Sequence, residues 1–386
     1  MLSLSSELEP SKQNGLYRRL ETLFSPNHSR IQIGRRIFVN FSSNNYLGLA
    51  NHPQVVRKAQ SALRRWGAGS GASRLLSGNL KIHEDLERRL ADFKREEAAL
   101  VFSSGYLANL GAVTTLVNEK DVVLVDRLNH ASLIDAARLS RAKGWVYPHR
   151  DVDELDRLLG RAKGFRRRMV LTDAYFSMEG DLAPLDRIWE ICRKRHALLM
   201  IDEAHSTGVF GAHGRGAAEH FGLSGKIDVV MGTLSKSLGS VGGFIAGSAE
   251  LKEYLINRCR EFIYTTAPSP GASAAALASL ELIERRPSLR ARLWENTRFL
   301  RNKLSESGFD LMGSEGPVIP LLVGDTGKVL SIKKFLLKEG FWAAAIRPPT
   351  VPRGTDRIRL SITASHSKED LKELAQALKK AKEKFL

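Results

Sequence analysis

Cysteine is nearly absent from this chain: its 386 residues include two, Cys192 and Cys259. Both lie in helix-like surroundings, so they exclude a disulfide framework and offer no metal-ligand spacing. The sequence also lacks any run that approaches the ~18 uninterrupted apolar residues of a membrane span. Its first residues do not show the basic-then-apolar order of a secretory signal. We therefore expect a protein of the reducing cytoplasm that holds no metal and contacts no membrane.

Acidic residues are also scarce, because 42 Asp and Glu face 59 Lys and Arg and leave a net charge of +17. Such a charge favours anionic partners, either nucleic acid or small anionic ligands. An ordinary basic surface without a binding function is an equal alternative. No zinc-finger, RNP or basic-zipper pattern is present, so nucleic-acid binding would rest on charge alone. We expect no nucleic-acid partner.

The chain does have a regular alternation of strand-like and helix-like segments from about residue 45 to 270. Apolar strand candidates lie at 99–102, 122–125, 169–172, 197–202, 229–233 and 243–246. Amphipathic segments separate them, such as 185–195, where Leu185, Ile188 and Cys192 recur at helical spacing. This alternation predicts an α/β fold with a mainly parallel sheet covered on both faces, whose ligands bind at the carboxyl ends of the strands.

The length of the chain suggests more than one domain. Residues 1–40 are polar and mixed, and we expect a short helix and an arm there. Residues 41–280 form the predicted large domain. Residues 281–386 form a predicted smaller α+β domain, with a helix at 289–309, strands at 318–323, 341–346 and 357–362, and a Lys-rich final helix.

A lysine and an aspartate follow two of the predicted strands. Lys236 stands in TLSKSLG, just past the apolar run 229–231, and Asp202 closes the run 197–201. Alone, such a lysine is usually a surface residue. A lysine amine beside a carboxylate is what an enzyme dependent on pyridoxal 5′-phosphate (PLP) needs, because the lysine binds the cofactor covalently and the acid keeps its ring nitrogen protonated. A carboxylate that is buried at the end of a strand is costly unless a cation, such as this protonated ring nitrogen, lies beside it.

Other strand ends supply groups that could complete this site. Ser104 and Gly105 open a helix whose free N–H groups suit a phosphate, although a plain helix cap is the alternative. Thr233 and Ser235 could add hydroxyl donors. The ring of His130 could cover a planar cofactor or could merely cap a helix. Ser177 and His205 could reach the phenolic oxygen of the cofactor, although turn chemistry also explains a serine there.

These residues, in this order, closely resemble the α-oxoamine synthase family of fold-type-I PLP enzymes. The segments that carry the likeness are NFSSNNYLGL at 40–49, GAGSGASRLLSG at 67–78, SSGYLAN at 103–109, DRLNHASL at 126–133, FSMEGD at 176–181, IDEAHSTGVFG at 201–211, TLSKSLGS at 233–240 and IYTTAP at 263–268. The resemblance implies an aspartate-aminotransferase-like large domain with a mainly parallel seven-stranded sheet. It also implies a homodimer whose active site lies at the subunit interface.

The resemblance also implies a role for each matching residue. Lys236 would hold PLP and later act as base, Asp202 would pair with the ring nitrogen, and His130 would stack on the ring. The remaining implied contacts are Ser177 and His205 to the phenolic oxygen; Ser104, Gly105, Tyr106 and Thr233 to the phosphate; Thr265 or Thr266 to the phosphate from a second subunit; and Arg18, Asn44, Thr350 and Arg359 to substrate. Arg74 stands where some members carry histidine, and we assign it no role.

The segment 346–355, IRPPTVPRGT, bears on the choice of substrate. Its likeness implies that L-alanine condenses with a pimeloyl thioester, carried on CoA or on an acyl-carrier protein, with release of CO2 and thiol on the route to biotin. Condensation of glycine with acetyl-CoA, or another reaction of the family, is the alternative. A remote alternative is a non-catalytic basic binding protein built on a PLP fold.

Overall fold

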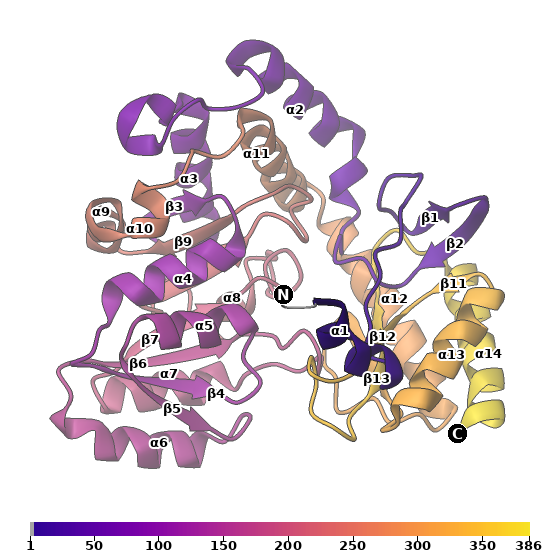
Figure 1. Cartoon of the computed structure of the whole chain (residues 1–386). Helices are drawn as coiled ribbons and strands as arrows, with labels where there is room; N and C mark the ends of the chain where they lie inside the picture. The colour runs from indigo at the N-terminus through magenta and orange to yellow at the C-terminus, as the bar shows by residue number, and fades with distance from the viewer. Residues whose placement is uncertain (1–3) are drawn as a thin grey trace. The chain divides into compact units, whose positions relative to one another are not determined.

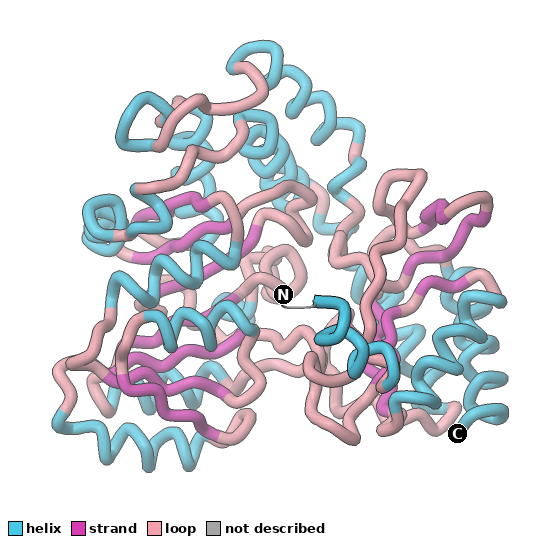
Figure 2. The backbone as a smooth tube through the Cα atoms, in the orientation of Figure 1, coloured by secondary structure: helices cyan, strands magenta, loops and turns pink. Residues whose placement is uncertain are grey.

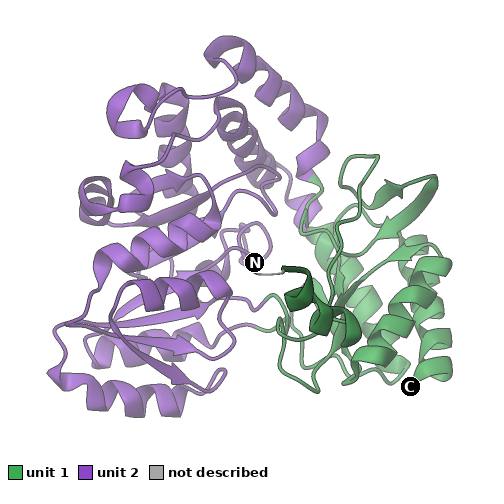
Figure 3. Ribbon diagram, viewed as in Figure 1, with its two compact units in different colours: residues 1–48, 177–181, 291–386 green, residues 49–176, 182–290 purple. Residues whose placement is uncertain are grey.

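The computed structural model describes residues 4–386, which divide into two compact units (Figure 3). Unit 2 comprises residues 49–176 and 182–290. Unit 1 comprises residues 177–181 and 291–386 together with the N-terminal residues up to Gly48. The N-terminal segment belongs with the C-terminal one because strand β2 (Arg36–Asn40) pairs in parallel with β11 (Phe341–Trp342).

A seven-stranded sheet forms the centre of unit 2, in the strand order β3-β9-β8-β7-β6-β4-β5 (Figures 1 and 2). Its strands are β3 Ala98–Phe102, β4 Val122–Asp126, β5 Lys143–Tyr147, β6 Arg168–Asp173, β7 Leu198–Asp202, β8 Val229–Thr233 and β9 Gly243–Gly247. Only β9 runs antiparallel to its neighbours β3 and β8. The predicted α/β class with a mainly parallel seven-stranded sheet is therefore confirmed.

Helices connect these strands and cover the sheet. They are α2 Pro53–Trp66, α3 Lys81–Lys94, α4 Gly105–Leu116, α5 Ala131–Leu139, α6 Val152–Arg161, α7 Leu185–Lys194, α8 Ala217–His220, α9 Ala249–Arg258, α10 Arg260–Ile263 and α11 Pro270–Arg285, with short turns of helix at Leu49–Asn51, Arg74–Gly78 and Ala162–Gly164. One hydrophobic core joins α4 and α5 to the sheet through residues such as Ala112, Leu133 and Val125. Central strands are buried along their whole length, which explains their continuous apolar sequences.

Unit 1 contains two three-stranded sheets and its own core. Its elements are α1 Leu4–Gln13, β1 Arg30–Ile33, β2, α12 Pro287–Glu306 from residue 291 onward, β10 Val318–Leu322, α13 Thr326–Lys338, β11, β12 Ala344–Ile346, β13 Arg357–Ser361 and α14 Lys368–Phe385. The sheets have the orders β1-β2-β11 and β10-β13-β12. Apolar residues of α13 and α14, such as Ile332 and Leu374, pack with Ile358 and Leu360 of β13.

Residues 177–181 belong to unit 1 although the chain on both sides of them belongs to unit 2. Two buried arginines of β13 hold this segment. Arg357 donates to the carbonyl oxygen of Met178 and to the carboxylate of Glu179, each at 3.0 Å. Arg359 donates through Nε to the carbonyl oxygen of Ser177 at 2.6 Å.

Two sequence predictions of strands are corrected by the structure. The predicted strand at 341–346 is interrupted at Ala343, so β11 pairs with β2 whereas β12 pairs with β13. Strand β5 was not predicted, because its sequence KGWVY lies at the edge of the sheet with a largely exposed pattern. Across residues 4–386 we find no helix that is both long and apolar enough to cross a membrane.

Candidate active site

A cavity of about 250 Å³ opens in unit 2 where the parallel strands end. The residues that line it follow β3, β4, β6, β7 and β8: Ser104, Gly105, Tyr106, Asn109, His130, Ser132, Asp173, Asp202, Ala204, His205, Met231, Thr233, Ser235 and Lys236. The structure thus brings together Lys236, Asp202 and His130, which lie far apart in the sequence. Parallel strands explain this convergence, because their carboxyl ends share one edge of the sheet.

Asp202 is the last residue of β7 and is 4% exposed. Its Oδ1 accepts a hydrogen bond from the backbone N–H of Ala204 at 2.8 Å, and its Oδ2 accepts one from Nδ2 of Asn109 at 2.7 Å. Both donors are neutral. Since a buried carboxylate is costly without a positive partner, the cavity suits a ligand that brings a cation to Asp202, as the ring nitrogen of PLP does when protonated.

Asp173 is the register partner of Asp202 on the neighbouring strand β6. Its Oδ2 accepts a hydrogen bond from the backbone N–H of His130 at 2.7 Å. Burial, and then the nearby charge of Asp202, raise the pKa of Asp173 well above its ordinary value. This direction favours the protonated form of Asp173.

His130 caps the N-terminus of α5, and its ring lines the cavity. Its Nδ1 accepts a hydrogen bond from the backbone N–H of Ser132 at 3.3 Å and lies 2.7 Å from Oγ of the same residue. Partial removal of water lowers the pKa of His130, an effect that Asp202 opposes and Lys236 reinforces. A neutral ring with one free face can stack on a planar ligand.

The N-terminus of α4 forms the part of the cavity that suits a phosphate. Ser104 caps the helix, and its Oγ accepts a hydrogen bond from the N–H of Leu107 at 3.1 Å. Oγ1 of Thr233 lies 2.8 Å from Oγ of Ser235. A Cβ added to Gly105 would stand 2.8 Å from Cε of Met231 and 3.5 Å from Cβ of Thr233, so the helix starts close to β8. Free N–H groups and hydroxyls in one corner can bind an anion.

Three further predicted residues line the same cavity. Lys236 follows β8 and is half-buried, and His205 is buried in the turn after β7. Tyr106 is more exposed, and its hydroxyl donates to the carboxylate of Asp135, which raises the pKa of Tyr106.

Thr265 and Thr266 do not line this cavity. They lie in a segment that is bound to the glycine-rich stretch 67–78: Ser73 forms a β-bridge with Thr266, and Oγ of Ser70 donates to the carbonyl oxygen of Pro268 at 2.6 Å. Their contact with the phosphate of a second subunit stays a prediction.

The predicted substrate residues and Ser177 belong to unit 1. Arg359 is 5% exposed and donates to Oδ1 of Asn44 at 3.2 Å and to Oγ of Ser361 at 3.0 Å, besides the carbonyl oxygen of Ser177. All these acceptors are neutral. Arg18 donates to Oγ1 of Thr350 at 3.2 Å, so the two other predicted residues are also neighbours.

The sequence patterns did not identify two residues that line the cavity, Asn109 and Asp173. Asn109 stands in the SSGYLAN segment and donates to both Asp202 and Oγ of Ser132, yet the motif gave it no role. Asp173 directly precedes the AYFSMEGD segment, and its position at a strand end was the available signal. Its protonation, however, depends on pairing with β7, which no local pattern reveals.

A buried ion pair lies directly behind Asp202. The Nζ of Lys94, at the end of α3, donates to the carboxylate of Glu203, to Oγ1 of Thr207 at 2.8 Å and to the carbonyl oxygen of Arg215. The side chains of Lys94 and Glu203 are 3% and 1% exposed. Lys94 thereby fixes the turn that carries both Asp202 and His205.

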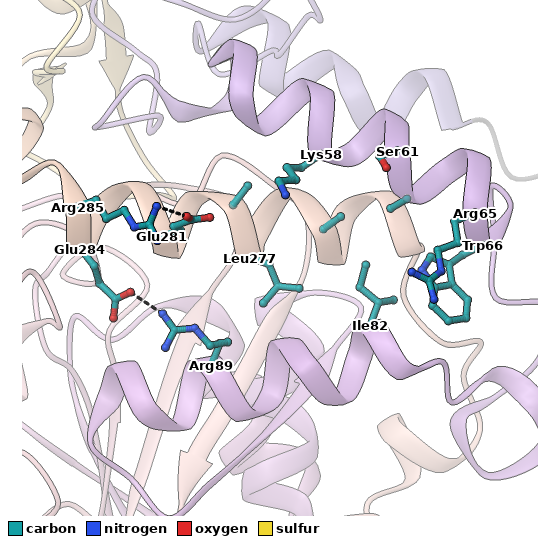
Figure 4. Close-up of a pocket in the computed structure, with 13 residues that line it drawn as sticks. Lys58, Ser61, Arg65, Trp66, Ile82, Arg89, Leu277, Glu281, Glu284 and Arg285 are labelled. Atoms are coloured by element: carbon teal, nitrogen blue, oxygen red, sulfur yellow. Dashed lines mark hydrogen bonds and ion pairs between the residues drawn. The ribbon is translucent and has the colours of Figure 1, made fainter.

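A larger cavity, of about 590 Å³, lies between α2, α3 and α11 of unit 2 (Figure 4). Several of its charged side chains neutralise one another, because Arg89 pairs with Glu284 at 2.5 Å and Arg285 with Glu281 at 2.8 Å. It contains no lysine, histidine and carboxylate in mutual contact, so the smaller cavity remains the candidate for chemistry.

Comparison with known proteins gives consistent relatives. The aminotransferase class I and II family matches residues 36–378. The 8-amino-7-oxononanoate synthase of Geobacter sulfurreducens is 48% identical over 378 residues, which cover 97% of this chain and 97% of that protein. The enzyme of the same name from Thermoanaerobacter pseudethanolicus is 45% identical over 378 residues, covering 98% of this chain and 96% of that protein.

Solved structures share the fold. A high-resolution structure of SPT with PLP as an internal aldimine has a TM-score of 0.94 at 32% identity and covers 99% of this chain and 97% of that one. The 8-amino-7-oxononanoate synthase of Francisella tularensis has a TM-score of 0.79 at 27% identity and covers 90% of this chain and 99% of that one.

Proposed function

Because this chain belongs to the aminotransferase class I and II family, and within it to the α-oxoamine synthases, we propose that it is a PLP-dependent acyltransferase of biotin biosynthesis. It condenses L-alanine with a pimeloyl thioester and gives 8-amino-7-oxononanoate, CO2 and free thiol. The single observation that carries this reaction is the cavity that joins Lys236, Asp202 and His130.

The groups of the cavity fit PLP. Asp202 is a buried carboxylate whose hydrogen-bond donors are neutral, so a protonated ring nitrogen would complete its surroundings. Asn109 and the backbone N–H of Ala204 hold this carboxylate in place. The raised pKa of Asp173 disfavours a second negative charge that would compete with Asp202 for the cation. When bound, PLP withdraws electrons from the α-carbon of the amino acid that is joined to it.

Lys236 has two functions in this proposal. Its amine holds the cofactor, and after L-alanine displaces it the same amine accepts the α-proton. His130 covers one face of the cofactor ring, and its lowered pKa keeps its own ring neutral at that face. His205 and Ser177 bind the phenolic oxygen, as the resemblance implies.

The phosphate of the cofactor binds at the N-terminus of α4. Ser104, Gly105 and Tyr106 supply the first turn of that helix, and Thr233 supplies a hydroxyl. The helix dipole favours an anion at this end by about 0.3–1 kcal/mol. Thr265 or Thr266 adds a hydroxyl from a second subunit of a homodimer.

Arg359 and Asn44 bind the carboxylate of L-alanine. The hydrogen bonds of Arg359 go to neutral oxygens, so its positive charge remains available for an anionic substrate. One Arg–carboxylate contact contributes roughly 1.5–3 kcal/mol, which is about ten- to hundredfold in binding. Such a contact orients the carboxyl group that leaves as CO2.

The acyl donor is pimeloyl-CoA or pimeloyl-acyl-carrier protein, and Arg18 and Thr350 contact it. The fold does not separate members of the family by substrate, so the substrate follows from the relatives at 45% and 48% identity. The predicted location is the cytoplasm, where CoA and carrier-protein thioesters are available.

Thiol release tests the proposal. The purified protein with PLP should release thiol only when both L-alanine and pimeloyl-CoA are present. Lys236→Ala should abolish this release together with the visible absorption band of bound PLP, whereas the exposed Lys163→Ala should retain at least half of both. Faster release with glycine and acetyl-CoA would replace the assigned substrates, and turnover that persists in Lys236→Ala would exclude the mechanism.

A further inference from the structure

Three cations of unit 1 lie together: Arg18 on the arm after α1, Lys333 on α13 and Arg347 directly after β12. Arg347 donates through Nη2 to the carbonyl oxygen of Tyr17 at 3.1 Å, and Arg18 donates to Thr350 at 3.2 Å. Each arginine thus reaches the segment that carries the other. The two contacts bring charges from distant parts of the sequence into one cluster.

This cluster is not neutralised by ion pairs. Within residues 4–386, neither Arg18, Lys333 nor Arg347 has a carboxylate at salt-bridge distance. Asp356, whose charge acts on Arg347, is buried and accepts a hydrogen bond from Oγ1 of Thr326 at 2.6 Å. Burial and then the charge of Arg347 lower the pKa of Lys333, against a smaller opposing effect of Glu21. Burial and then the charge of Arg18 lower the pKa of Arg347, against a smaller opposing effect of Asp356. Because these like charges repel one another, an anion bound among them would relieve the repulsion and be held favourably.

Apolar side chains accompany the cations. Nζ of Lys333 lies 5.4 Å from the ring centroid of Trp342. Tyr17, Leu20 and Phe24 are exposed along the arm. A surface that combines exposed apolar groups with unpaired cations matches a ligand that has both an acyl chain and an anionic group.

We propose that Lys333 and Arg347, together with Arg18, form a receptor for an anionic group of the acyl thioester. The inference rests on the proposed function, which supplies an acyl thioester as substrate. Two groups of that substrate share the required chemistry: the terminal carboxylate of a dicarboxylic acyl chain and the phosphates of its CoA carrier. Lys333 and Arg347 would then determine which acyl thioesters the enzyme accepts.

Equilibrium binding without L-alanine tests the receptor, since no condensation occurs under that condition. The PLP-loaded enzyme is titrated by calorimetry with pimeloyl-CoA, with heptanoyl-CoA, which lacks the terminal carboxylate, and with pimeloyl-pantetheine, which lacks the phosphates. Lys333→Met and Arg347→Gln are compared with wild type. Lys334→Met removes the neighbouring exposed lysine of the same helix and serves as the matched control.

Each neutral variant should weaken pimeloyl-CoA about ten- to hundredfold, whereas Lys334→Met should change its Kd less than twofold. If the carboxylate is the ligand, heptanoyl-CoA binds the variants and wild type equally. If phosphate is the ligand, both CoA thioesters weaken and pimeloyl-pantetheine does not. Either result supports the receptor and identifies its anion.

Three results would overturn the receptor. In the first, the Kd for all three thioesters changes less than twofold in both neutral variants. In the second, the wild-type protein binds none of the three thioesters. In the third, Lys333→Arg and Arg347→Lys, which retain the charge, lose as much affinity as the neutral variants, so the two side chains have only a structural role. Thiol release by the wild type is measured separately, so failure of the proposed function is distinguished from failure of the receptor.

Discussion

Two adjacent carboxyl groups in the cavity of unit 2, Asp173 and Asp202, have different surroundings. Asp202 accepts two hydrogen bonds from donors aimed at its oxygens, whereas Asp173 accepts one from the backbone of His130 and faces the charge of Asp202. Like charges at neighbouring strand ends cannot both ionise cheaply. The raised pKa of Asp173 therefore favours a single negative charge on this pair of carboxyl groups.

Neutralising each carboxyl group should have unequal effects. Asp202→Asn keeps the shape of the side chain but removes the charge, so we expect kcat for thiol release to fall at least ~100-fold, about 2.7 kcal/mol of transition-state stabilisation. Asp173→Asn is the matched control, because the raised pKa of Asp173 favours its neutral form, and the loss of kcat in this variant should stay below about tenfold. Steady-state kinetics checks both variants. Equal losses would mean that the charge has been assigned to the wrong residue.

The sequence could predict some of these residues and not others. Asp202 was predictable because it ends an apolar run, and Lys236 because it follows one closely, where a polar residue has few structural explanations. Lys94 was not, because a lysine in the last turn of a helix ordinarily lies in solvent and interacts with the helix dipole. Its partner Glu203 stands 109 residues away along the chain, and only the folded sheet brings the two together.

Removing the amine of Lys94 should destabilise the protein strongly. Lys94→Met leaves the carboxylate of Glu203 buried and unpaired, which costs about 3–5 kcal/mol of unfolding free energy. The double variant Lys94→Met/Glu203→Gln should recover more than half of that loss, because the amide still accepts the hydrogen bond from Ala218. Urea unfolding measures both.

An exposed ion pair provides the comparison for this experiment. Arg157 and Glu154 lie on the surface of α6, so Arg157→Met should leave the unfolding free energy close to that of wild type. A loss below ~1 kcal/mol for Lys94→Met would contradict the proposed importance of the buried pair.

The glycine-rich stretch 67–78 is bound to a neighbouring segment, and its glycines differ in how closely they are packed. It binds the segment that carries Thr266 through the bridge of Ser73 and the hydroxyl of Ser70. At its end, a Cβ on Gly78 would stand 2.1 Å from the carbonyl oxygen of Ala72, whereas Gly69 has open space around it. Only one of these two glycines is thus required by packing.

Alanine substitutions should separate the two glycines. Gly78→Ala forces backbone to move and should lower the unfolding free energy by about 1–3 kcal/mol. Gly69→Ala, in the same stretch, should stay within ~0.5 kcal/mol of wild type. Thermal and urea unfolding report the difference. If both variants behaved like wild type, the stretch would be loose enough to accommodate the added methyl group.

Strands could be predicted from the sequence where they are buried along almost their whole length. The central strands β4, β6, β7 and β8 are buried on both faces, and their continuous apolar runs identified them. The edge strand β5 has only one fully buried residue, Tyr147, so its pattern resembled a loop. The break between β11 and β12 depends on two different partner strands, β2 and β13, which local sequence does not encode.

At the scale of the whole molecule, stability depends on buried groups that join distant parts of the chain. In unit 1, His366 is fully buried and stacks on Phe41, with ring centroids 4.2 Å apart. Its Nδ1 accepts from the N–H of Thr363 at 3.1 Å, and Nε2 donates to the carbonyl oxygen of Asn40 at 3.0 Å. These bonds require the neutral ring and connect the N-terminal and C-terminal segments.

Burial lowers the pKa of His366 from an ordinary value of 6.5 to about 4. Between these pH values the unfolded chain binds a proton that the folded chain does not, so the free energy of unfolding falls as the pH falls. The contribution is complete above pH 7 and decreases by about 3 kcal/mol by pH 4. His366→Gln should lose stability at pH 8 and should lack this part of the pH dependence. Urea unfolding from pH 4 to pH 8, followed by tryptophan fluorescence, measures both profiles. If the two profiles ran parallel below pH 6.5, protonation of His366 would not limit the acid stability of the protein.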